Sequence, residues 1–190
     1  MKIFLTINDI PDAPMRWLSL PDSSLLKTDN PFFVPDFDTD FEARPVLAVR
    51  NDKLGKSISA RFADRYCHEF AAGIVIVAKN LLKKLREEGA PWTAATGFDR
   101  SCIIGSFHPV SELEKHQDIM FSDNNGNGLA GKFPDREALG EALERISAYN
   151  TMKTGDIILL PADIGQLKLS VNSRIDISSH AQSLLNIKIK

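Results

Sequence analysis

The sequence predicts one α+β domain in which short strands outnumber two or three helices. A β-branched run at residues 73–78 is typical of a buried strand. Residues 135–148 carry Leu139, Leu143 and Ile146 at helical spacing, which predicts an amphipathic helix. The 190 residues are 43% hydrophobic and 25% charged, an ordinary composition for a globular chain with a sizeable core.

The domain is expected to span residues 1–190 without a linker or an internal repeat. Residues 1–35 are rich in proline and aspartate, which predicts an irregular segment running over a core built from residues 36–190. Residues 41–50 should form a strand. Because Pro45 has no N–H to donate to a sheet ladder, this strand is expected at an edge of the sheet, or Pro45 near its end.

A helix is expected after a turn at residues 51–56, with Ser57 or Ser59 as its N-cap. Its apolar side chains recur every four positions, at Ile58, Phe62, Tyr66 and Phe70. Residues 81–88 predict a second helix, which ends before Gly89 because glycine favours helix C-termini.

The C-terminal half is expected to contain mostly short strands. Residues 103–107 predict one strand, and the Asp-Asn-Asn-Gly-Asn-Gly sequence at 123–128 predicts a loop tip, because Asn and Gly tolerate positive φ. After the helix at 135–148, four further short strands are expected, at residues 156–160, 166–171, 174–177 and 183–189.

The charge balance argues against several classes of partner. Lys and Arg total 23 against 25 Asp and Glu, with no basic run, so neither nucleic acid nor an anionic membrane surface is expected to bind. The apolar stretch at residues 70–78 is far shorter than the ~20 residues of a membrane span. Two cysteines, Cys67 and Cys102, and the lack of a recognisable signal peptide favour a cytoplasmic location with free buried thiols.

Several distinctive segments follow one another in order between residues 20 and 190. They include Pro-Phe-Phe-Val-Pro-Asp-Phe at 31–37, Phe-Glu-Ala-Arg at 41–44, Gly-Phe-Asp at 97–99 and Leu-Leu-Asn-Ile-Lys-Ile-Lys at 184–190. Together these segments resemble the fumarylacetoacetate hydrolase family. The resemblance implies a mixed β-sandwich roll and usually a homodimer. It also implies hydrolysis, decarboxylation or isomerisation of small dicarbonyl acids around Mg²⁺ or another divalent cation.

The residues at the family's functional positions mostly differ from the family pattern. The resemblance places the first metal-ligating glutamate on Glu42, but the second falls on Arg44 and the ligating aspartate falls on Val75. The family's substrate-binding lysine falls on Thr96. One ligand of three is retained, so no metal ion or other cofactor is expected.

The chemistry of Arg44 strengthens this expectation. Residues i and i+2 of a strand share a face, so Glu42 and Arg44 should point into the same cavity. A guanidinium stays charged, and unit charges ~4 Å apart repel by ~4 kcal/mol at an effective dielectric near ~20. Arg44 is therefore expected to oppose a divalent cation, and we hypothesise that it bridges Glu42 in the cation's place.

Three functional hypotheses follow. The preferred one is a catalytically inactive family member that binds a small carboxylate or a partner, with Arg44, Lys79, Phe98 and Asp99 as candidate ligand-binding residues. The second is a metal-independent hydrolase or isomerase, with Glu42 and Asp99 as acid and base and Arg44 or Lys79 holding a carboxylate. The third is a structural subunit that forms a hetero-oligomer with an intact family member.

Two other residue pairs offer weaker candidate sites. Cys67 and His68 are expected as neighbours on a helix, where adjacent side chains do not face each other, so they should form no nucleophile and base pair. Ser106 and His108 would share a strand face, but no nucleophile elbow surrounds the serine.

Overall fold

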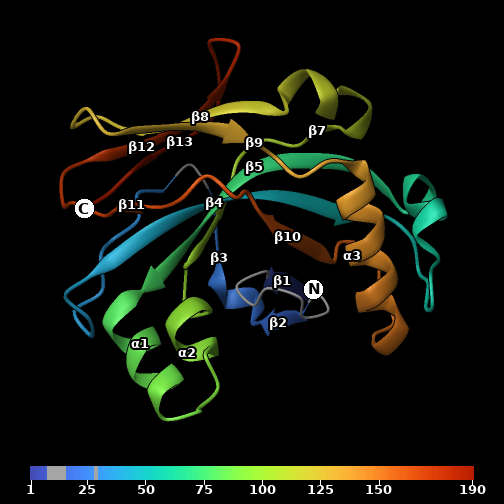
Figure 1. The fold of residues 1–190 in the computed structure, drawn as a ribbon, viewed down its shortest axis with the longest axis horizontal. Helices are drawn as coiled ribbons and strands as arrows, with labels where there is room; N and C mark the ends of the chain where they lie inside the picture. Colours follow the sequence, from blue (N-terminus) through green and yellow to red (C-terminus); the bar gives the residue numbers. More distant parts are fainter. Residues whose placement is uncertain (8–15, 28–29) are drawn as a thin grey trace.

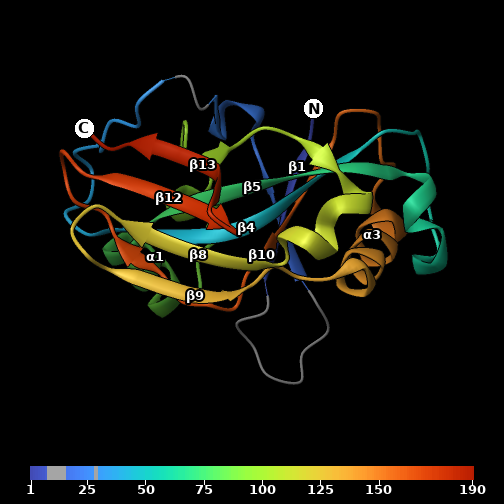
Figure 2. The same ribbon diagram turned by 90° about the horizontal axis from the view of Figure 1, so that it is seen from above.

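The computed structural model describes residues 1–7, 16–27 and 30–190. Within these residues, nine strands form one curled sheet and four strands form a smaller one, which lies over it (Figures 1 and 2). The main path of the large sheet runs in the order β2, β1, β10, β4, β5, β6, β3, and β11 and β7 pair with β4 and β5. The arrangement is a mixed α+β roll, which confirms the predicted fold class.

The large sheet contains β1 (Ile3–Ile7), β2 (Arg16–Leu20), β3 (Leu25–Lys27), β4 (Phe41–Asn51), β5 (Cys67–Ala78), β6 (Cys102–Ile104), β7 (His108–Pro109), β10 (Ile157–Pro161) and β11 (Leu167–Lys168). The small sheet contains β8 (Asp118–Asp123), β9 (Gly128–Lys132), β12 (Arg174–Ser179) and β13 (Gln182–Lys188). The α-helices are α1 (Lys79–Glu87), α2 (Thr93–Thr96) and α3 (Arg136–Tyr149). Three 3-10 helices lie at Asp22–Ser24, Ala60–Arg65 and Val110–His116.

The long antiparallel pair of β4 and β5 separates two hydrophobic cores. Alternate side chains such as Leu47 and Ile74 join the core beneath the small sheet and α3. The intervening side chains, including Val46 and Val75, join a second core with Leu82 of α1. Figure 1 shows α1 and α2 on this second side, opposite the small sheet.

The prediction that residues 1–35 are irregular was wrong for β1, β2 and β3, whereas residues 30–35 lie in no helix or strand of the two sheets. Residues 8–15 and 28–29 lie outside the described part. β1 is buried and pairs in parallel with β10, while β2 pairs antiparallel with β1. A strand buried on both faces has a continuous apolar run instead of alternation. The run Ile3-Phe4-Leu5 fits this pattern, but the prolines and aspartates that follow obscured it.

The edge position predicted for β4 was also wrong, because this strand lies between β5 and β10. Its neighbour on one side changes at the proline: β10 pairs as far as Val46, and β11 begins opposite Ala43. The Pro45 carbonyl accepts a hydrogen bond from the Ala162 N–H in the connection between the two strands. The missing N–H therefore falls where the ladder is already interrupted, so a proline is tolerated inside a central strand.

The predicted helix from residue 57 to 70 is only partly helical. Ala60–Arg65 forms a 3-10 helix, and β5 then begins at Cys67, so Phe70 lies opposite Val49 on β4. The apolar side chains do recur every four positions, but residues from Cys67 onward form a strand because they pair along nearly the whole length of β4. Helices α1 and α3, the turn between β8 and β9 and the C-terminal strands agree with the prediction within a few residues.

Candidate functional site

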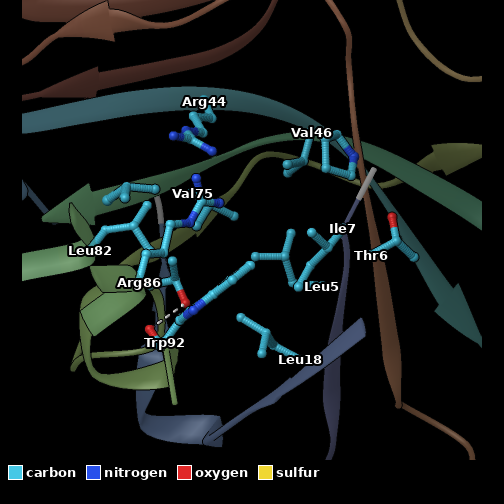
Figure 3. A pocket seen from close by; sticks show the side chains of 13 residues that line it. Leu5, Thr6, Ile7, Leu18, Arg44, Val46, Val75, Leu82, Arg86 and Trp92 are labelled. Atoms are coloured by element: carbon cyan, nitrogen blue, oxygen red, sulfur yellow. Dashed lines mark hydrogen bonds between the residues drawn. The ribbon is translucent and has the colours of Figure 1, made fainter. Parts of the chain in front are cut away.

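A cavity opens on the face of the large sheet that carries α1 and α2 (Figure 3). Its cavity volume is about 70 Å³, and about 500 Å³ of space lies between its walls and in its open mouth together. Strands β4 and β5 form its floor, β1 and β2 form one wall, and α1 and α2 form another. The described residues that line it are Leu5, Thr6, Ile7, Leu18, Arg44, Val46, Val75, Val77, Leu82, Arg86, Trp92, Thr96 and Pro161.

The structure brings three of the sequence-predicted site residues together in this cavity. Arg44 and Val75 lie opposite each other on β4 and β5, and Thr96 at the end of α2 lines the same space. Val75 and Thr96 are buried. The cavity therefore lies at the positions where the resemblance placed metal and substrate binding, and the substituted side chains leave it open.

Glu42 and Arg44 form the ion pair that alternation on a strand predicted. Arg44 donates from Nε to Glu42 Oε1 at 2.9 Å and from Nη2 to the same oxygen at 2.5 Å. The Glu42 side chain is 4% exposed and that of Arg44 is 32% exposed. Because a buried carboxylate needs a partner, the pair stabilises a charge that would otherwise be costly to bury.

Two lysines extend this ion pair towards solvent. Lys79 Nζ, at the start of α1, lies 3.8 Å from Glu42 Oε2 and 3.9 Å from Asp40 Oδ2. Lys168 Nζ lies 3.4 Å from Asp40 Oδ1. The Glu42 carboxylate thus has a cationic group beside each of its oxygens. Both lysines are mostly exposed, so their effect is screened by water and salt.

These residues do not fit a divalent cation. Oε1 of Glu42 accepts both hydrogen bonds from Arg44, and Val75 offers no donor atom. The Thr96 hydroxyl donates to the Trp92 carbonyl at 3.3 Å. In the part of the chain that the structure describes, no group of three or more His, Cys, Asp or Glu residues is arranged to hold a metal ion. Hard cations require several oxygen ligands, which this set does not supply.

Phe98 and Asp99 lie outside the described cavity lining. The Phe98 ring packs edge-on against Phe37 and Phe41, with ring centroids 5.1 Å and 6.0 Å apart, on the opposite side of the sheet. Asp99 is exposed in the turn that follows. The structure therefore brings neither residue together with Arg44 in the cavity.

Arg86 and Trp92 line the cavity although sequence reasoning did not select them. The Arg86 guanidinium carbon lies 4.3 Å from the Trp92 ring centroid, which is a cation–π contact. Arg86 follows the buried Leu82 by four positions, and residues i and i+4 share a helix face. This spacing was the signal that could have placed Arg86 at the cavity. Figure 3 shows both side chains beside Leu82.

Cys67 and His68 form no catalytic pair, as expected, but for a different reason. They lie on strand β5, where neighbouring side chains point to opposite faces, and not on the predicted helix. The His68 ring Nδ1 contacts Asp52 at 2.8 Å at the surface. The thiols of Cys67 and Cys102 are buried, and burial raises their pKa to about 12 and about 11.

No helix in the described ranges is both long and apolar enough to cross a membrane.

Known proteins resemble the chain along nearly its whole length. The chain is 26% identical over 172 residues to a Caenorhabditis elegans protein named oxaloacetate tautomerase fahd-1, mitochondrial. The matched region covers 89% of this chain and 80% of that protein. No family model matches the sequence.

Solved structures share the fold. A putative fumarylacetoacetate hydrolase family protein from Yersinia pestis CO92 has a TM-score of 0.85 at 21% identity, covering 100% of this chain and 92% of that one. The fumarylpyruvate hydrolase of Pseudomonas aeruginosa, in complex with Mn²⁺ and pyruvate, has a TM-score of 0.84 at 16% identity. The superposition covers 100% of this chain and 89% of the hydrolase chain.

Proposed function

We propose that this chain, which belongs to the fumarylacetoacetate hydrolase family, binds a small carboxylic acid in the cavity beside Arg44 and lacks the cation-dependent chemistry of the family. The observation that carries the proposal is the contact between Arg44 and Glu42. It places a permanent positive charge on the one carboxylate retained from the family's ligand set.

Electrostatics supports the absence of a cation. A divalent ion near Oε1 of Glu42 would have to displace Arg44 and would then face both this guanidinium and Lys79. At ~4 Å and an effective dielectric near ~20, one unit charge such as the guanidinium repels a divalent ion by ~8 kcal/mol. The mostly exposed Lys79 adds a smaller repulsion, because water and salt screen its charge. Arginine donates strong hydrogen bonds to carboxylates, and Nε and Nη2 of Arg44 already donate to Glu42, so a ligand carboxylate would share the guanidinium with Glu42.

A second candidate function is metal-independent tautomerisation of a small dicarbonyl acid. The observation in its favour is the name of the Caenorhabditis elegans relative, an oxaloacetate tautomerase. The pair of Glu42 and Asp99 gives this candidate little support as acid and base. Glu42 is held by Arg44, and Asp99 is exposed outside the described lining of the cavity.

Thermal unfolding tests the proposal. Native protein is heated with Mn²⁺ alone, with oxalate plus EDTA, and with both ions together. We expect oxalate to raise the unfolding temperature in EDTA and Mn²⁺ to add nothing. A ligand at about 100 times its Kd adds ~2.7 kcal/mol, or roughly 5–10 °C for a chain of this size. A rise with Mn²⁺ alone would contradict the proposal, as would no rise with either oxalate or any small monocarboxylic acid.

Two variants provide the controls. The triple change Arg44→Glu, Val75→Asp and Thr96→Lys restores the family's residue types and should gain a response to Mn²⁺. Lys84→Glu changes the charge of an exposed residue on α1 outside the described lining, and should behave as the native protein. Oxaloacetate tautomerisation, followed by ultraviolet absorbance, completes the test. Turnover that EDTA abolishes would refute the proposal, while turnover that survives EDTA would establish the second candidate.

A further inference from the structure

The cavity walls are mostly hydrocarbon, and this limits what can bind there. β1 contributes Leu5 and Ile7, β2 contributes Leu18, and β5 contributes Val75 and Val77. Ligand pockets commonly combine such walls with a few polar groups that fix the orientation of the ligand. Most of the described lining here matches the body of an apolar molecule.

The two hydroxyl groups of the lining direct their protons to the backbone. Thr6 Oγ1 donates to the Leu159 carbonyl at 3.2 Å, and Thr96 Oγ1 donates to the Trp92 carbonyl at 3.3 Å. Neither hydroxyl can therefore donate to a ligand without giving up that bond. A ligand carbonyl placed against the leucine and valine walls, away from Arg44, Arg86 and Trp92, would lose its hydrogen bonds to water without replacement, which costs several kcal/mol in the least favourable case.

The two arginines differ in position. Arg44 rises from β4 in the floor and is held by Glu42, whereas Arg86 is exposed on α1 and lies over Trp92. A carboxylate beside Arg44 would leave the remainder of the ligand against the walls from β1 and β2. Figure 3 shows Leu5 and Leu18 across the cavity from Leu82 and Trp92, so an extended body would be enclosed from two sides.

We infer that the ligand of this cavity is a monocarboxylic acid with a hydrocarbon body, its carboxylate beside Arg44 and its body between Leu18 and Val75. This inference rests on the proposed function and narrows its ligand class. A compact acid with two carbonyl groups would bind mainly through polar contacts. The hydrocarbon acid would instead gain most of its affinity from the apolar surface that it buries.

A homologous series of straight-chain acids tests the inference. Titrations of acetate, butanoate, hexanoate and octanoate would be followed by Trp92 fluorescence in a Trp17→Phe background, because the chain has only these two tryptophans. Each added methylene should tighten binding by up to ~4-fold until the cavity is filled. Hexanol should bind more weakly than hexanoate because it lacks the charge that pairs with Arg44. Calorimetry on the native chain checks the fluorescence result.

Variants separate the inference from its competitor, a dicarboxylate that spans both arginines. Leu18→Gln should weaken hexanoate by roughly tenfold and leave oxalate unchanged. Leu129→Gln, at a half-buried leucine on β9 outside the described lining, is the matched control. Because Arg86 contacts Trp92, Arg86→Gln is measured by calorimetry, and it should change the affinities for hexanoate and adipate by the same factor. If adipate binds more tightly than hexanoate and loses that advantage in Arg86→Gln, the ligand is a dicarboxylate and the inference is wrong.

Different binding results would rule out the hydrocarbon ligand and the proposed carboxylate-binding function. If oxalate binds but lengthening the acid from acetate to octanoate gives no gain, the hydrocarbon ligand is ruled out and the proposed function stands. If neither oxalate nor any acid of the series binds, both are wrong.

Discussion

Arg44 and Glu42 meet on one face of β4, with Nη2 of the arginine 2.5 Å from Oε1 of the glutamate. The two residues are separated by one position, so the pleat of the strand brings them together without any long-range arrangement. Val75 lies directly opposite Arg44 on β5. The charge in the floor of the cavity is therefore fixed by the two longest strands of the fold.

Removing the arginine alone should destabilise the protein. Among the described residues, Arg44→Met leaves the buried Glu42 carboxylate with the longer contact to Lys79 as its ion pair, and we expect the free energy of unfolding to fall by roughly 2–3 kcal/mol. Arg44 is one-third exposed, which keeps the loss below that of a fully buried pair. The double variant Glu42→Gln, Arg44→Met should recover most of the loss. Urea unfolding measures both, and equal stabilities for the two variants would contradict a paired role.

Asp38 should stabilise the N-terminus of α1 although it lies far from this helix in sequence. Its Oδ2 accepts the Leu81 N–H at 2.9 Å, and its Oδ1 accepts from the Asn80 side chain at 2.8 Å. Helix α1 lacks a side-chain cap of its own, because its N-cap residue is Ala78. Asp38→Ala should therefore cost about 1 kcal/mol in urea unfolding. Asp36→Ala, at an exposed neighbour, is the control and should be close to neutral.

The same carboxyl predicts a pH dependence. Burial raises the pKa of Asp38, but its hydrogen bonds, the one from Leu81 foremost, lower the pKa below its ordinary value overall. A carboxyl whose pKa is lower in the folded state contributes stability above its unfolded pKa of about 3.9 and loses it as the pH falls through the folded pKa. The stability difference between native protein and Asp38→Asn should therefore be constant near neutrality and shrink below about pH 4. A difference that grows on acidification would contradict the assignment.

Both cysteines should be unreactive in the folded protein. Burial raises the pKa of Cys67 to about 12 and of Cys102 to about 11, so thiolate is scarce at about pH 8, and the sulfur atoms are shielded from reagents. Iodoacetamide should label neither thiol in native protein and both in urea, as counted by mass spectrometry. Rapid labelling of either one without denaturant would show that the large sheet opens locally at that strand.

Gly131 on β9 should not tolerate a side chain. A Cβ at this position would lie 1.7 Å from Cγ2 of Ile164, whereas a Cβ at Gly128 on the same strand would meet Met120 Sδ at 3.5 Å, an ordinary contact. Gly131→Ala should cost roughly 1–3 kcal/mol through overpacking, and Gly128→Ala should be nearly neutral. Adding Ile164→Ala to Gly131→Ala should restore part of the loss. Thermal unfolding compares the four proteins, and equal effects of the two glycine changes would refute this packing.

Local patterns in the sequence predicted much of the site, because the site depends on local geometry. The facing of Glu42 and Arg44 follows from strand alternation, and α3 follows from its apolar spacing. The cap of α3, in which Asp135 accepts the Ala138 N–H, was seen only in the structure. The position of Arg86 was available from its spacing to Leu82 but was overlooked.

Other features depend on pairing between distant segments, which local patterns do not contain. Pro45 favours an edge strand by itself, and only the interruption between β10 and β11 explains its central position. Phe70 fits a helical stripe, and only its register opposite Val49 assigns it to a strand. The pairing of Ile3 with Ile157 joins residues from the two ends of the chain.

The pairing of β1 with β10 makes the cavity a late product of folding. Leu5, Ile7 and Leu18 belong to the first 20 residues, yet β1 is held in place by a strand that begins at Ile157. Contacts so distant in sequence carry a large loop-closure cost and form slowly. During synthesis, a chain that has not reached β10 lacks the strand that joins β1 and β2 to the rest of the large sheet. Ligand binding in the cavity would therefore show that β1 has paired with β10.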